Sequence, residues 1–340
     1  MIWHLSETIY GRIKMIDKRI LKIAKNVIKL ERESLKKLQS SIGSSFENII
    51  KTILNCKNGK IIVSGVGKSG IIANKWSATL SSTGTPSFFL DASNASHGDM
   101  GKITSGDVVI LISLSGESNE LKNIIQFTSR NKNIKLIGVT SKKDSSLYKN
   151  ADVKFLLPNV KEAGPGSFVP TSSTTVQMAL GDAIAMTCMT YKKFGILDFK
   201  KFHPSGSLSV KLRTVEDLML VGSKIPFAHE NISMKVALKK ISKKGLGTLI
   251  LKNNTNSTKG IITDGDLKRL SIKGREFSEL KIKKVMKKNP ISVDKNILAA
   301  QALSIMNSKK ITSLCVHQNK KKNKTIGFIH IHNIISANIT

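Results

Sequence analysis

Acidic residues are scarce in this sequence. Asp and Glu number 23 against 55 Lys and Arg, which gives a formal net charge of +32 over 340 residues. Aromatic residues are scarce too, at 5%, and the lysines are spread over every segment. A groove that binds single-stranded nucleic acid needs aromatic side chains on which bases can stack. We therefore expect no specific nucleic-acid function, and we expect the charge to attract anionic substrates.

Cysteine and long apolar runs are also rare. Cys56, Cys188 and Cys315 are odd in number, far apart and without metal-ligand spacing. They predict neither a disulfide framework nor a metal cluster, and they favour a reducing compartment, the cytoplasm. No apolar run approaches the roughly 20 residues of a membrane-spanning helix, and polar residues break every apolar run near the N-terminus. We expect neither a membrane span nor a signal peptide.

Helical and strand-like patterns alternate over the first 200 residues. Apolar residues recur at steps of three and four over 15–55, which predicts helix. Beyond residue 60, short apolar runs such as IIV, FFL, VVILI, LIGV and FLL are separated by helical patterns. This alternation predicts βαβ units and therefore an α/β domain with a parallel β-sheet flanked by helices, of flavodoxin-like or Rossmann-like type.

A repeat occupies the region beyond residue 215. The matching pairs are VEDLM at 215–219 with IKKVM at 282–286, VALKKISKKGLGTLIL at 236–251 with QALSIMNSKKITSLCV at 301–316, and GIITDGDLKRL at 260–270 with GFIHIHNIISA at 327–337. The offset is 67 residues for the first and last pairs and 65 for the middle pair. Each unit predicts the order helix, strand, strand, helix, and we expect the two units to pack about a pseudo-twofold axis.

The stretch IIVSGVGKSG at 61–70 predicts a strand, a glycine turn and a helix. A phosphate-binding P-loop needs a glycine five positions before Gly67, where Ile62 stands, so that motif is excluded. Gly65, Gly67 and Gly70 have the G-x-G-x-x-G spacing of a dinucleotide-binding site. Such a site also needs an acidic residue about 20 positions later to bind the ribose, and Asp91 is the only candidate. The dinucleotide site is the less favoured interpretation of this corner.

Two hydroxyl clusters follow predicted strands, where ligands bind in open parallel sheets. Each precedes a predicted helix, whose free backbone N–H groups and positive dipole end suit a phosphate monoester. The hydroxyls are those of Ser113, Ser115 and Ser118 in SLSGESNE, and of Ser172, Ser173 and Thr174 in PTSSTT. Ordinary helix N-caps would use the same residue types, and that alternative stays open.

Five residues with charged or imidazole side chains lie in or beside these loops, and each has a structural alternative. Lys68 in the glycine corner either binds a phosphate or polarises a substrate carbonyl group, or it is a solvent-exposed lysine without a function. Glu120 complements a helix dipole or acts on substrate. Glu162, His97 and His203 lie in loops among small residues. Each of them either transfers a proton or contacts a ligand, or is an ordinary surface residue, and the sequence does not separate these alternatives.

Several motifs together resemble the arabinose-5-phosphate isomerase family, in which a sugar isomerase (SIS) domain precedes two CBS modules. They are GVGKSG at 65–70, SSTGTPSFF at 81–89, ASHGD at 95–99, ISLSGESNE at 112–120, KEAGPGSFVPTSSTT at 161–175, HPSGSL at 203–208 and GIITDGDLKR at 260–269. The resemblance runs over about 30–337. The domains it implies are an N-terminal helical segment at 1–45, SIS at 46–200, a linker at 201–214, and CBS modules at 215–276 and 280–340.

The resemblance implies interconversion of D-ribulose 5-phosphate and D-arabinose 5-phosphate through an enediol, which supplies 3-deoxy-D-manno-octulosonate for lipopolysaccharide. Lys68, Glu120, Glu162 and His203 would be catalytic, with either Glu162 or His203 as the base. Substrate contacts would come from Gly84, Thr85, His97 and the hydroxyl clusters. Because one proton and two electrons move between neighbouring carbons, no cofactor is expected. Paralogues serving capsule or sugar-alcohol operons, and a non-catalytic sugar-phosphate sensor, are the alternatives.

The resemblance also bears on metals and partners. Asp91 stands where the family often has a zinc-binding histidine, and an aspartate paired with His97 is a weaker zinc site, so zinc binding is not expected. CBS pairs often bind adenine nucleotides through an aspartate in a strand-to-helix turn; Asp266 has that place in the first unit and Asn333 in the second. The resemblance leaves a nucleotide and a pathway metabolite as alternative ligands of the CBS pair. A homotetramer is expected, in which the HPSG segment beginning at His203 reaches a neighbouring pocket.

Overall fold

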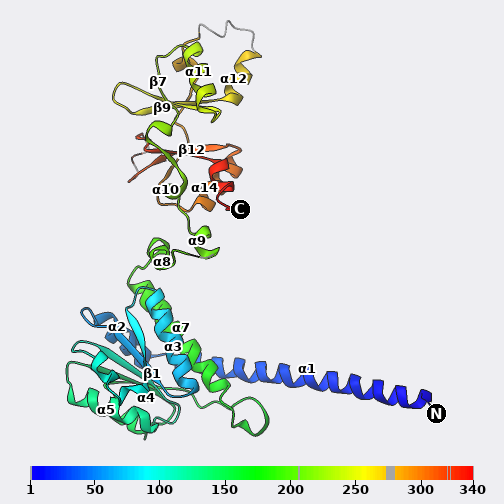
Figure 1. Cartoon of the computed structure of the whole chain (residues 1–340), viewed down its shortest axis with the longest axis vertical. Coiled ribbons are helices and arrows are strands. Elements are labelled where there is room, and N and C mark those ends of the chain that lie inside the picture. Colours follow the sequence, from blue (N-terminus) through cyan, green and yellow to red (C-terminus); the bar gives the residue numbers. More distant parts are fainter. Residues whose placement is uncertain (1, 206, 273–279, 320, 322, 340) are drawn as a thin grey trace. The chain divides into compact units, whose positions relative to one another are not determined.

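The protein is described by a computed structural model that covers residues 2–205, 207–272, 280–319, 321 and 323–339. The chain divides into two compact units, 1–199 and 200–340 (Figure 1). Gly206 of the HPSG motif and the predicted end of the first CBS module at 273–276 lie outside the described residues.

A five-stranded parallel sheet forms the centre of the first unit, and this confirms the predicted α/β class. Its strands, in spatial order, are β2 (Ser87–Asp91), β1 (Ile61–Gly65), β3 (Val108–Ile112), β4 (Lys135–Thr140) and β5 (Val153–Leu156). Every residue of β1 and β3 is buried. That burial is typical of central strands covered on both faces.

Helices cover both faces of this sheet and enclose two separate apolar cores. The first core is shared by α1 (Ile2–Ser41), α2 (Ser44–Asn55), α3 (Lys68–Ser82) and α7 (Ser172–Tyr191). The second is shared by α4 (Ala92–Ala95), α5 (Asn119–Arg130) and α6 (Ser146–Asn150). Short 3₁₀ turns lie at Asp99–Lys102 and Pro165–Ser167.

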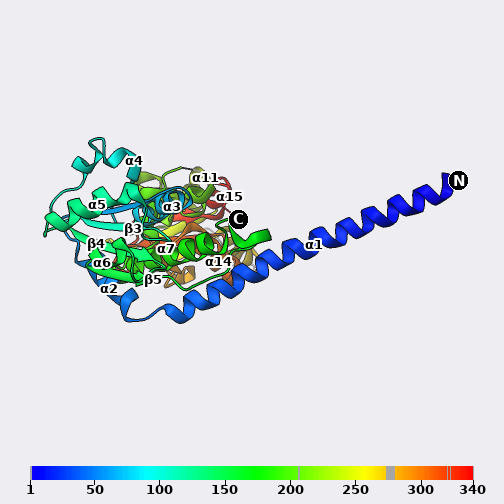
Figure 2. The same ribbon diagram turned by 90° about the horizontal axis from the view of Figure 1, so that it is seen from below.

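The helix predicted over 15–55 is divided into two helices. Gly43, with φ −160° and ψ −148°, separates α1 from α2, because this extended backbone ends one helix and lets the next begin at a new angle. Figure 2 shows α1 as one long helix whose C-terminal end reaches the domain. That end joins the first core through the buried side chain of Leu38.

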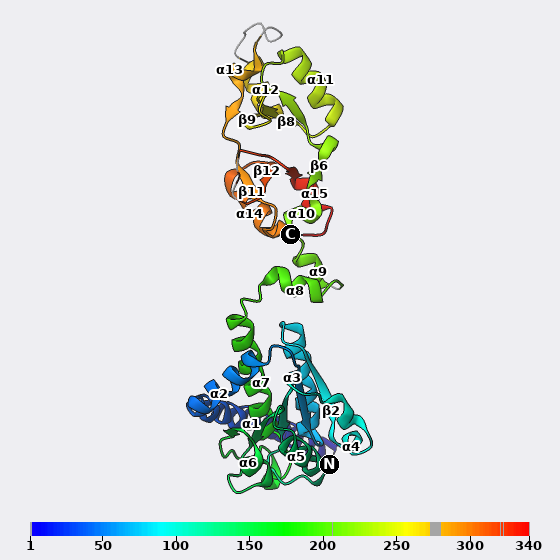
Figure 3. The same cartoon turned by 90° about the vertical axis from the view of Figure 1, so that its left-hand side faces the viewer.

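The second unit contains two small sheets, each with its own helices (Figure 3). The first half has β7 (Phe227–His229), α11 (Met234–Lys244), β8 (Thr248–Lys252), β9 (Thr258–Thr263) and α12 (Asp264–Ser271). The second half has β11 (Ser292–Asp294), α14 (Ala299–Lys309), β12 (Ser313–His317), β13 (Gly327–His330) and α15 (Ile331–Ile335). The predicted order of helix, strand, strand and helix is therefore confirmed in both halves.

Short elements connect and flank the two halves. They are α8 (Ile196–Phe202), α9 (Ser207–Lys211), α10 (Val215–Leu218), β6 (Leu220–Val221), a 3₁₀ turn at Gly222–Lys224, α13 (Ile282–Val285) and β10 (Lys287–Lys288). Strand β6 pairs with β13 of the second half, and β10 pairs with β9 of the first. Each repeat therefore contributes one strand to the sheet of the other.

Equivalent residues of the two repeats make equivalent contacts. Thr258 and Thr325, 67 positions apart, share a hydrogen bond of 2.8 Å between their hydroxyls. The exchanged strands bring Met219 over Gly327 and Met286 over Gly260. These reciprocal contacts are those of a pseudo-twofold pair. At Gly260 the backbone oxygen of Lys287 leaves no room for a Cβ, whereas at Gly327 the neighbouring atoms belong to the Met219 side chain.

We predict that Gly260→Ala destabilises the second unit by about 1–3 kcal/mol, as overpacking does. Its Cβ would lie 2.8 Å from the backbone oxygen of Lys287 and 2.6 Å from Met286 Sδ. Urea unfolding of the full chain measures the effect. Gly265→Ala is the control, because its nearest neighbour outside the helix backbone is 3.5 Å away. Equal unfolding midpoints for Gly260→Ala and the unchanged protein would contradict the packing argument.

Candidate functional site

Close contact between β1 and α3 builds the glycine corner. A Cβ on Gly70 would lie 2.7 Å from the carbonyl oxygen of Gly65, and a Cβ on Gly65 would lie 2.9 Å from that of Ile112. Gly67, with φ +57°, makes the turn between them. Close packing of α3 on β1 therefore explains the glycine spacing that resembles a dinucleotide-binding motif. Lys68 is exposed in the first turn of α3.

Helix α7 is held against α3 beside this corner. Ser69 Oγ donates a 3.2 Å hydrogen bond to Gln177 Oε1, and the indole nitrogen of Trp76 donates a 2.9 Å bond to the carbonyl oxygen of Gln177. Gln177 is buried. Because Gln177 lies in the second turn of α7, these bonds place the start of α7 next to the corner that carries Lys68.

The serine loop after β3 is an ordered turn. Ser113 Oγ accepts a bond of 3.1 Å from the backbone N–H of Gly116 and lies 3.1 Å from Ser118 Oγ. Gly116 has φ +69°, and a Cβ there would overlap Ser145, so only glycine fits. Ser115 and Glu120 are exposed at the edge of this turn. The loop is therefore shaped before any ligand arrives, and it leaves these two side chains accessible.

Glu162 is tied to the start of α7. Its Oε2 accepts bonds from the backbone N–H of Thr171 at 2.8 Å, the Thr171 hydroxyl at 3.2 Å and the backbone N–H of Ser173 at 3.2 Å. Burial raises the pKa of Glu162, but the hydrogen bonds from Ser173 and Thr171 outweigh it, so the pKa lies below its ordinary value. In this arrangement Glu162 is a charged cap for α7.

The second hydroxyl cluster is turned inward. Ser172 and Ser173 are buried, and Thr174 donates to the carbonyl oxygen of Thr171 at 2.8 Å. Ser172 Oγ has no hydrogen-bond partner among the described residues. Substrate contact by this cluster stays a prediction, because within one copy of the chain Ser172 and Ser173 are buried and Thr174 is half-buried.

The structure does not bring Gly84 and Thr85 to the edge that carries Lys68. They precede β2, at the amino ends of the strands, whereas Lys68 follows the carboxyl end of β1. Thr85 is 1% exposed, and its hydroxyl accepts a 2.9 Å bond from Lys192 Nζ. The space beside Gly84 is filled by the ring of Phe194. One copy of the chain therefore cannot use these residues in the same pocket.

The residues predicted near a zinc ion do not form a zinc site. Asp91 caps α4, and its Oδ1 accepts from the backbone N–H of Ser93 at 2.8 Å and of Asn94 at 3.3 Å. His97 is an exposed loop residue. Over the part of the chain that the structure describes, no three His, Cys, Asp or Glu side chains are grouped to hold a metal. Within one copy of the chain, Asp91 is engaged as a helix cap, and the expected absence of zinc stays a prediction.

A cavity of about 230 Å³ opens at the carboxyl ends of β1 and β2. Gly65, Gly67, Asn74, Phe89 and Asp91 contribute to its lining, whereas Lys68, Ser115 and Glu162 do not. It is smaller than typical small-molecule pockets of about 300–1,000 Å³. His203 belongs to the second unit, so its part in this site stays a prediction.

Comparison with known proteins identifies the domains. The SIS domain model matches residues 53–187, and the CBS domain model matches 215–273 and 282–339. Arabinose 5-phosphate isomerase KdsD of Yersinia pestis is 39% identical over 316 residues, which are 93% of this chain and 95% of that protein. The chain belongs to the arabinose 5-phosphate isomerase family.

Other members and solved structures agree with this family assignment. KdsD of Escherichia coli K12 is also 39% identical over 93% of the chain. A protein of Escherichia coli CFT073 solved in complex with arabinose 5-phosphate is 38% identical, with a TM-score of 0.53, and covers 55% of this chain and 98% of its own. A sugar-phosphate isomerase homologue from Listeria monocytogenes is 32% identical over 55% of this chain, also with a TM-score of 0.53.

Thr171 opens the predicted hydroxyl cluster TSSTT at 171–175, but its contacts with Glu162 and Ala163 were not predicted. Its hydroxyl accepts a 2.8 Å bond from the backbone N–H of Ala163 and donates to Glu162, so it connects both ends of the loop before α7. It occupies the N-cap of α7. The available signal was its place directly before the helix, where threonine is a preferred cap.

We predict that Thr171→Val lowers the free energy of unfolding by about 1–3 kcal/mol, because the partly buried N–H of Ala163 loses its acceptor. Thr171→Ser keeps the hydroxyl and is the matched control.

The effect of Thr171→Val should also depend on pH, because the Thr171 hydroxyl helps to lower the folded-state pKa of Glu162. A carboxyl group of this kind stabilises the fold at a pH above its unfolded pKa, and this stabilisation is lost as the pH falls through its folded pKa. Urea unfolding should thus show a smaller difference between Thr171→Val and the unchanged protein below pH 4.5, the ordinary pKa of Glu162.

Proposed function

We propose that this chain interconverts D-ribulose 5-phosphate and D-arabinose 5-phosphate and so supplies 3-deoxy-D-manno-octulosonate for lipopolysaccharide. The observation that supports this most strongly is the 39% identity to arabinose 5-phosphate isomerase KdsD over 93% of the chain. The glycine corner with Lys68, the serine loop and the loop of Glu162 all belong to this matched region and follow strands of one parallel sheet.

The chemistry needs a phosphate holder, a proton carrier and a stabiliser for the enediolate oxygen. The serine loop, which ends at the start of α5, offers hydroxyls and free N–H groups for the phosphate. Lys68 is exposed and suits the oxygen, where one donor is worth about 2.7–4 kcal/mol. Glu162 or His203 carries the proton between C1 and C2, and the exposed Glu120 orders the sugar hydroxyls.

We also propose that the enzyme works as a homotetramer in which a second copy completes the pocket. The cavity of one copy is small, and Gly84 and Thr85 lie at the opposite edge of the sheet. The outer surface of α3 and α7 exposes Ile71, at 71%, together with Met178 and Met186. Met178 and Met186 lie on the same row of α7, one on either side of Asp182, so they offer another chain two apolar contacts next to the Lys75–Asp182 ion pair.

No metal or organic cofactor is needed in this proposal, because a proton and an electron pair move within the substrate itself. The three cysteines are free, which supports a reducing, cytoplasmic setting. Of the described residues, none form a helix long and apolar enough to cross a membrane.

The decisive experiment is conversion of D-ribulose 5-phosphate by the purified full chain, with a chelator and no added metal. Glu162→Gln and His203→Asn should each lower kcat by about 10²–10⁴-fold, the usual contribution of an acid–base group. Glu33→Gln, on the exposed face of α1, is the matched control and should keep the full rate.

Full rates in both Glu162→Gln and His203→Asn would overturn the assignment of the base. Tight binding of the sugar phosphate without any conversion would instead favour the sugar-phosphate sensor. Loss of activity in the chelated, unchanged protein with recovery on adding zinc would contradict the metal-free mechanism.

A further inference from the structure

Lys200 links His203 to a carboxylate of the second unit. The backbone N–H of His203, the residue after α8, donates a 3.2 Å hydrogen bond to the carbonyl oxygen of Lys200. The ammonium group of the same lysine pairs with the carboxylate of Asp217, 17 positions further along the chain. All three residues belong to the second unit. The position of His203 is therefore tied to that of Asp217 through one residue.

The carboxylate of Asp217 is itself held in place. Its Oδ2 accepts hydrogen bonds from the backbone N–H of Thr214 at 2.6 Å and from the Thr214 hydroxyl at 2.9 Å, besides the one from Lys200. Burial raises the pKa of Asp217, but the hydrogen bonds from Lys200 and Thr214 outweigh it, so the pKa lies below its ordinary value. The carboxylate is thus ionised at neutral pH and oriented by the backbone that it caps.

Helix α10, which carries Asp217, is fixed to the second repeat. The backbone N–H of Val215 donates to the carbonyl oxygen of Ile297 at 2.9 Å, and the N–H of Glu216 donates to that of Lys295 at 2.9 Å. The side chains of Glu216 and Lys295 form an ion pair of 2.6 Å, and Val215 is buried. Asp217 therefore offers Lys200 a partner on a rigid element.

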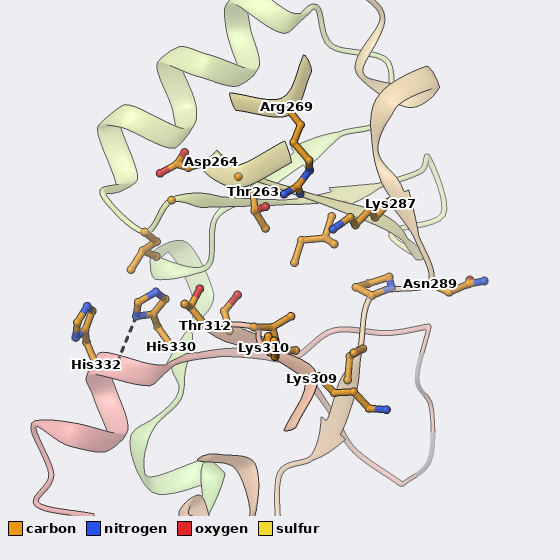
Figure 4. Close-up of a pocket in the computed structure, with 18 of the residues that line it drawn as sticks. Thr263, Asp264, Arg269, Lys287, Asn289, Lys309, Lys310, Thr312, His330 and His332 are labelled. Atoms are coloured by element: carbon orange, nitrogen blue, oxygen red, sulfur yellow. Dashed lines mark hydrogen bonds between the residues drawn. The ribbon is translucent and has the colours of Figure 1, made fainter. Parts of the chain in front are cut away.

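Helix α14 extends this anchor to the cavity of the second unit. The cavity, of about 780 Å³, lies between the two sheets, where a ligand of the CBS pair is expected (Figure 4). Lys309, at the C-terminal end of α14, contributes to its lining. At the other end of α14, the backbone N–H of Ala299 donates a 2.8 Å bond to the carbonyl oxygen of Arg213. One helix therefore runs from the cavity to the segment that precedes Asp217.

The second repeat shows that this turn does not need an acidic residue. Lys284 stands 67 positions after Asp217, in α13, and the residue before α13 is Lys281, which makes no side-chain capping bond. The backbone turn closes all the same, with a bond of 2.9 Å from the N–H of Lys284 to the carbonyl oxygen of Lys281. The carboxylate of Asp217 is therefore not required by the turn, and its distinctive contact is the one with Lys200.

We propose that the Lys200–Asp217 ion pair fixes the end of α8, and with it His203, to the second unit, so that the imidazole meets the substrate in one orientation. This inference rests on the proposed function, in which His203 is one of the two candidate proton carriers. Lys200 and Asp217 are positioning residues, because they act through His203 and do not touch the reacting atoms. Such positioning matters because a misplacement of about 1 Å costs about 100-fold in rate.

Two substitutions remove the ion pair from opposite sides. Lys200→Gln removes the ammonium group, and Asp217→Asn removes the charge of the carboxylate. The asparagine keeps an oxygen for the capping bond, as Asn333 does when it accepts the backbone N–H of His330 at 3.1 Å. Lys200→Arg keeps the ion pair, and Lys239→Gln, an exposed lysine of α11, is the charge-matched control.

Hydrogen–deuterium exchange of the full chain tests the anchor without any substrate. We expect exchange in peptides that span 196–205 to be about threefold to tenfold faster in Lys200→Gln and in Asp217→Asn, because an exposed element opens more often once its ion pair is lost. Lys200→Arg and Lys239→Gln should exchange as the unchanged protein does. Equal exchange in all four variants would overturn the proposal.

Conversion of D-ribulose 5-phosphate tests whether the anchor acts through His203. Lys200→Gln should lower kcat by about threefold to tenfold and leave KM within about twofold, whereas Lys239→Gln should keep the full rate. In the His203→Asn background, Lys200→Gln should lower kcat no further, because the imidazole that it positions is absent.

A full rate in Lys200→Gln, or an equal loss of kcat in both backgrounds, would overturn the proposal. No conversion by the unchanged chain, together with exchange that depends on the ion pair, would instead overturn the proposed function and support the anchor.

Discussion

The site of the first unit depends on one close contact, that of α3 with β1. Because Gly65 and Gly70 lack side chains, the helix backbone approaches the strand until a Cβ on Gly70 would lie 2.7 Å from the carbonyl oxygen of Gly65. This contact fixes where α3 begins, and therefore where Lys68 stands relative to the strand ends. Any larger residue at either glycine would push the helix away and move the lysine with it. The same contact brings α3 within reach of Gln177, so the position of α7 follows from it as well.

Glu162 shows how the start of α7 and the proposed chemistry are coupled. Its carboxylate holds two N–H groups of α7 and the hydroxyl of Thr171, and these bonds keep its pKa low. A carboxylate so held is a weak base. To accept a carbon-bound proton, Glu162 would have to give up bonds that a substrate would then need to replace. In the resting geometry, Glu162 positions the loop that precedes α7, and the choice between Glu162 and His203 as the base stays a prediction.

Sequence reasoning succeeded where a feature is local or periodic. The alternation of apolar runs predicted the parallel sheet, and the 67-residue offset predicted the paired repeats, because burial imposes those periods on each segment separately. It failed where the decisive partner is distant in the sequence. The filling of the space beside Gly84 by Phe194, and the binding of Asp266 by Lys287, depend on tertiary contacts that no spacing reveals. The contact of Thr171 with Ala163 was not predicted for the same reason, since Ala163 lies at the other end of a loop.

The two CBS repeats carry different residues at positions that face their shared cavity. Features that hold the fold are kept in both halves: the capping bond of Asp266 and Asn333, the hydroxyl pair of Thr258 and Thr325, and the glycines beneath the exchanged strands. At the cavity, by contrast, Gly245 is matched by Lys310, and Thr263 by His330. A twofold scaffold with unlike walls presents one asymmetric site in place of two equal ones.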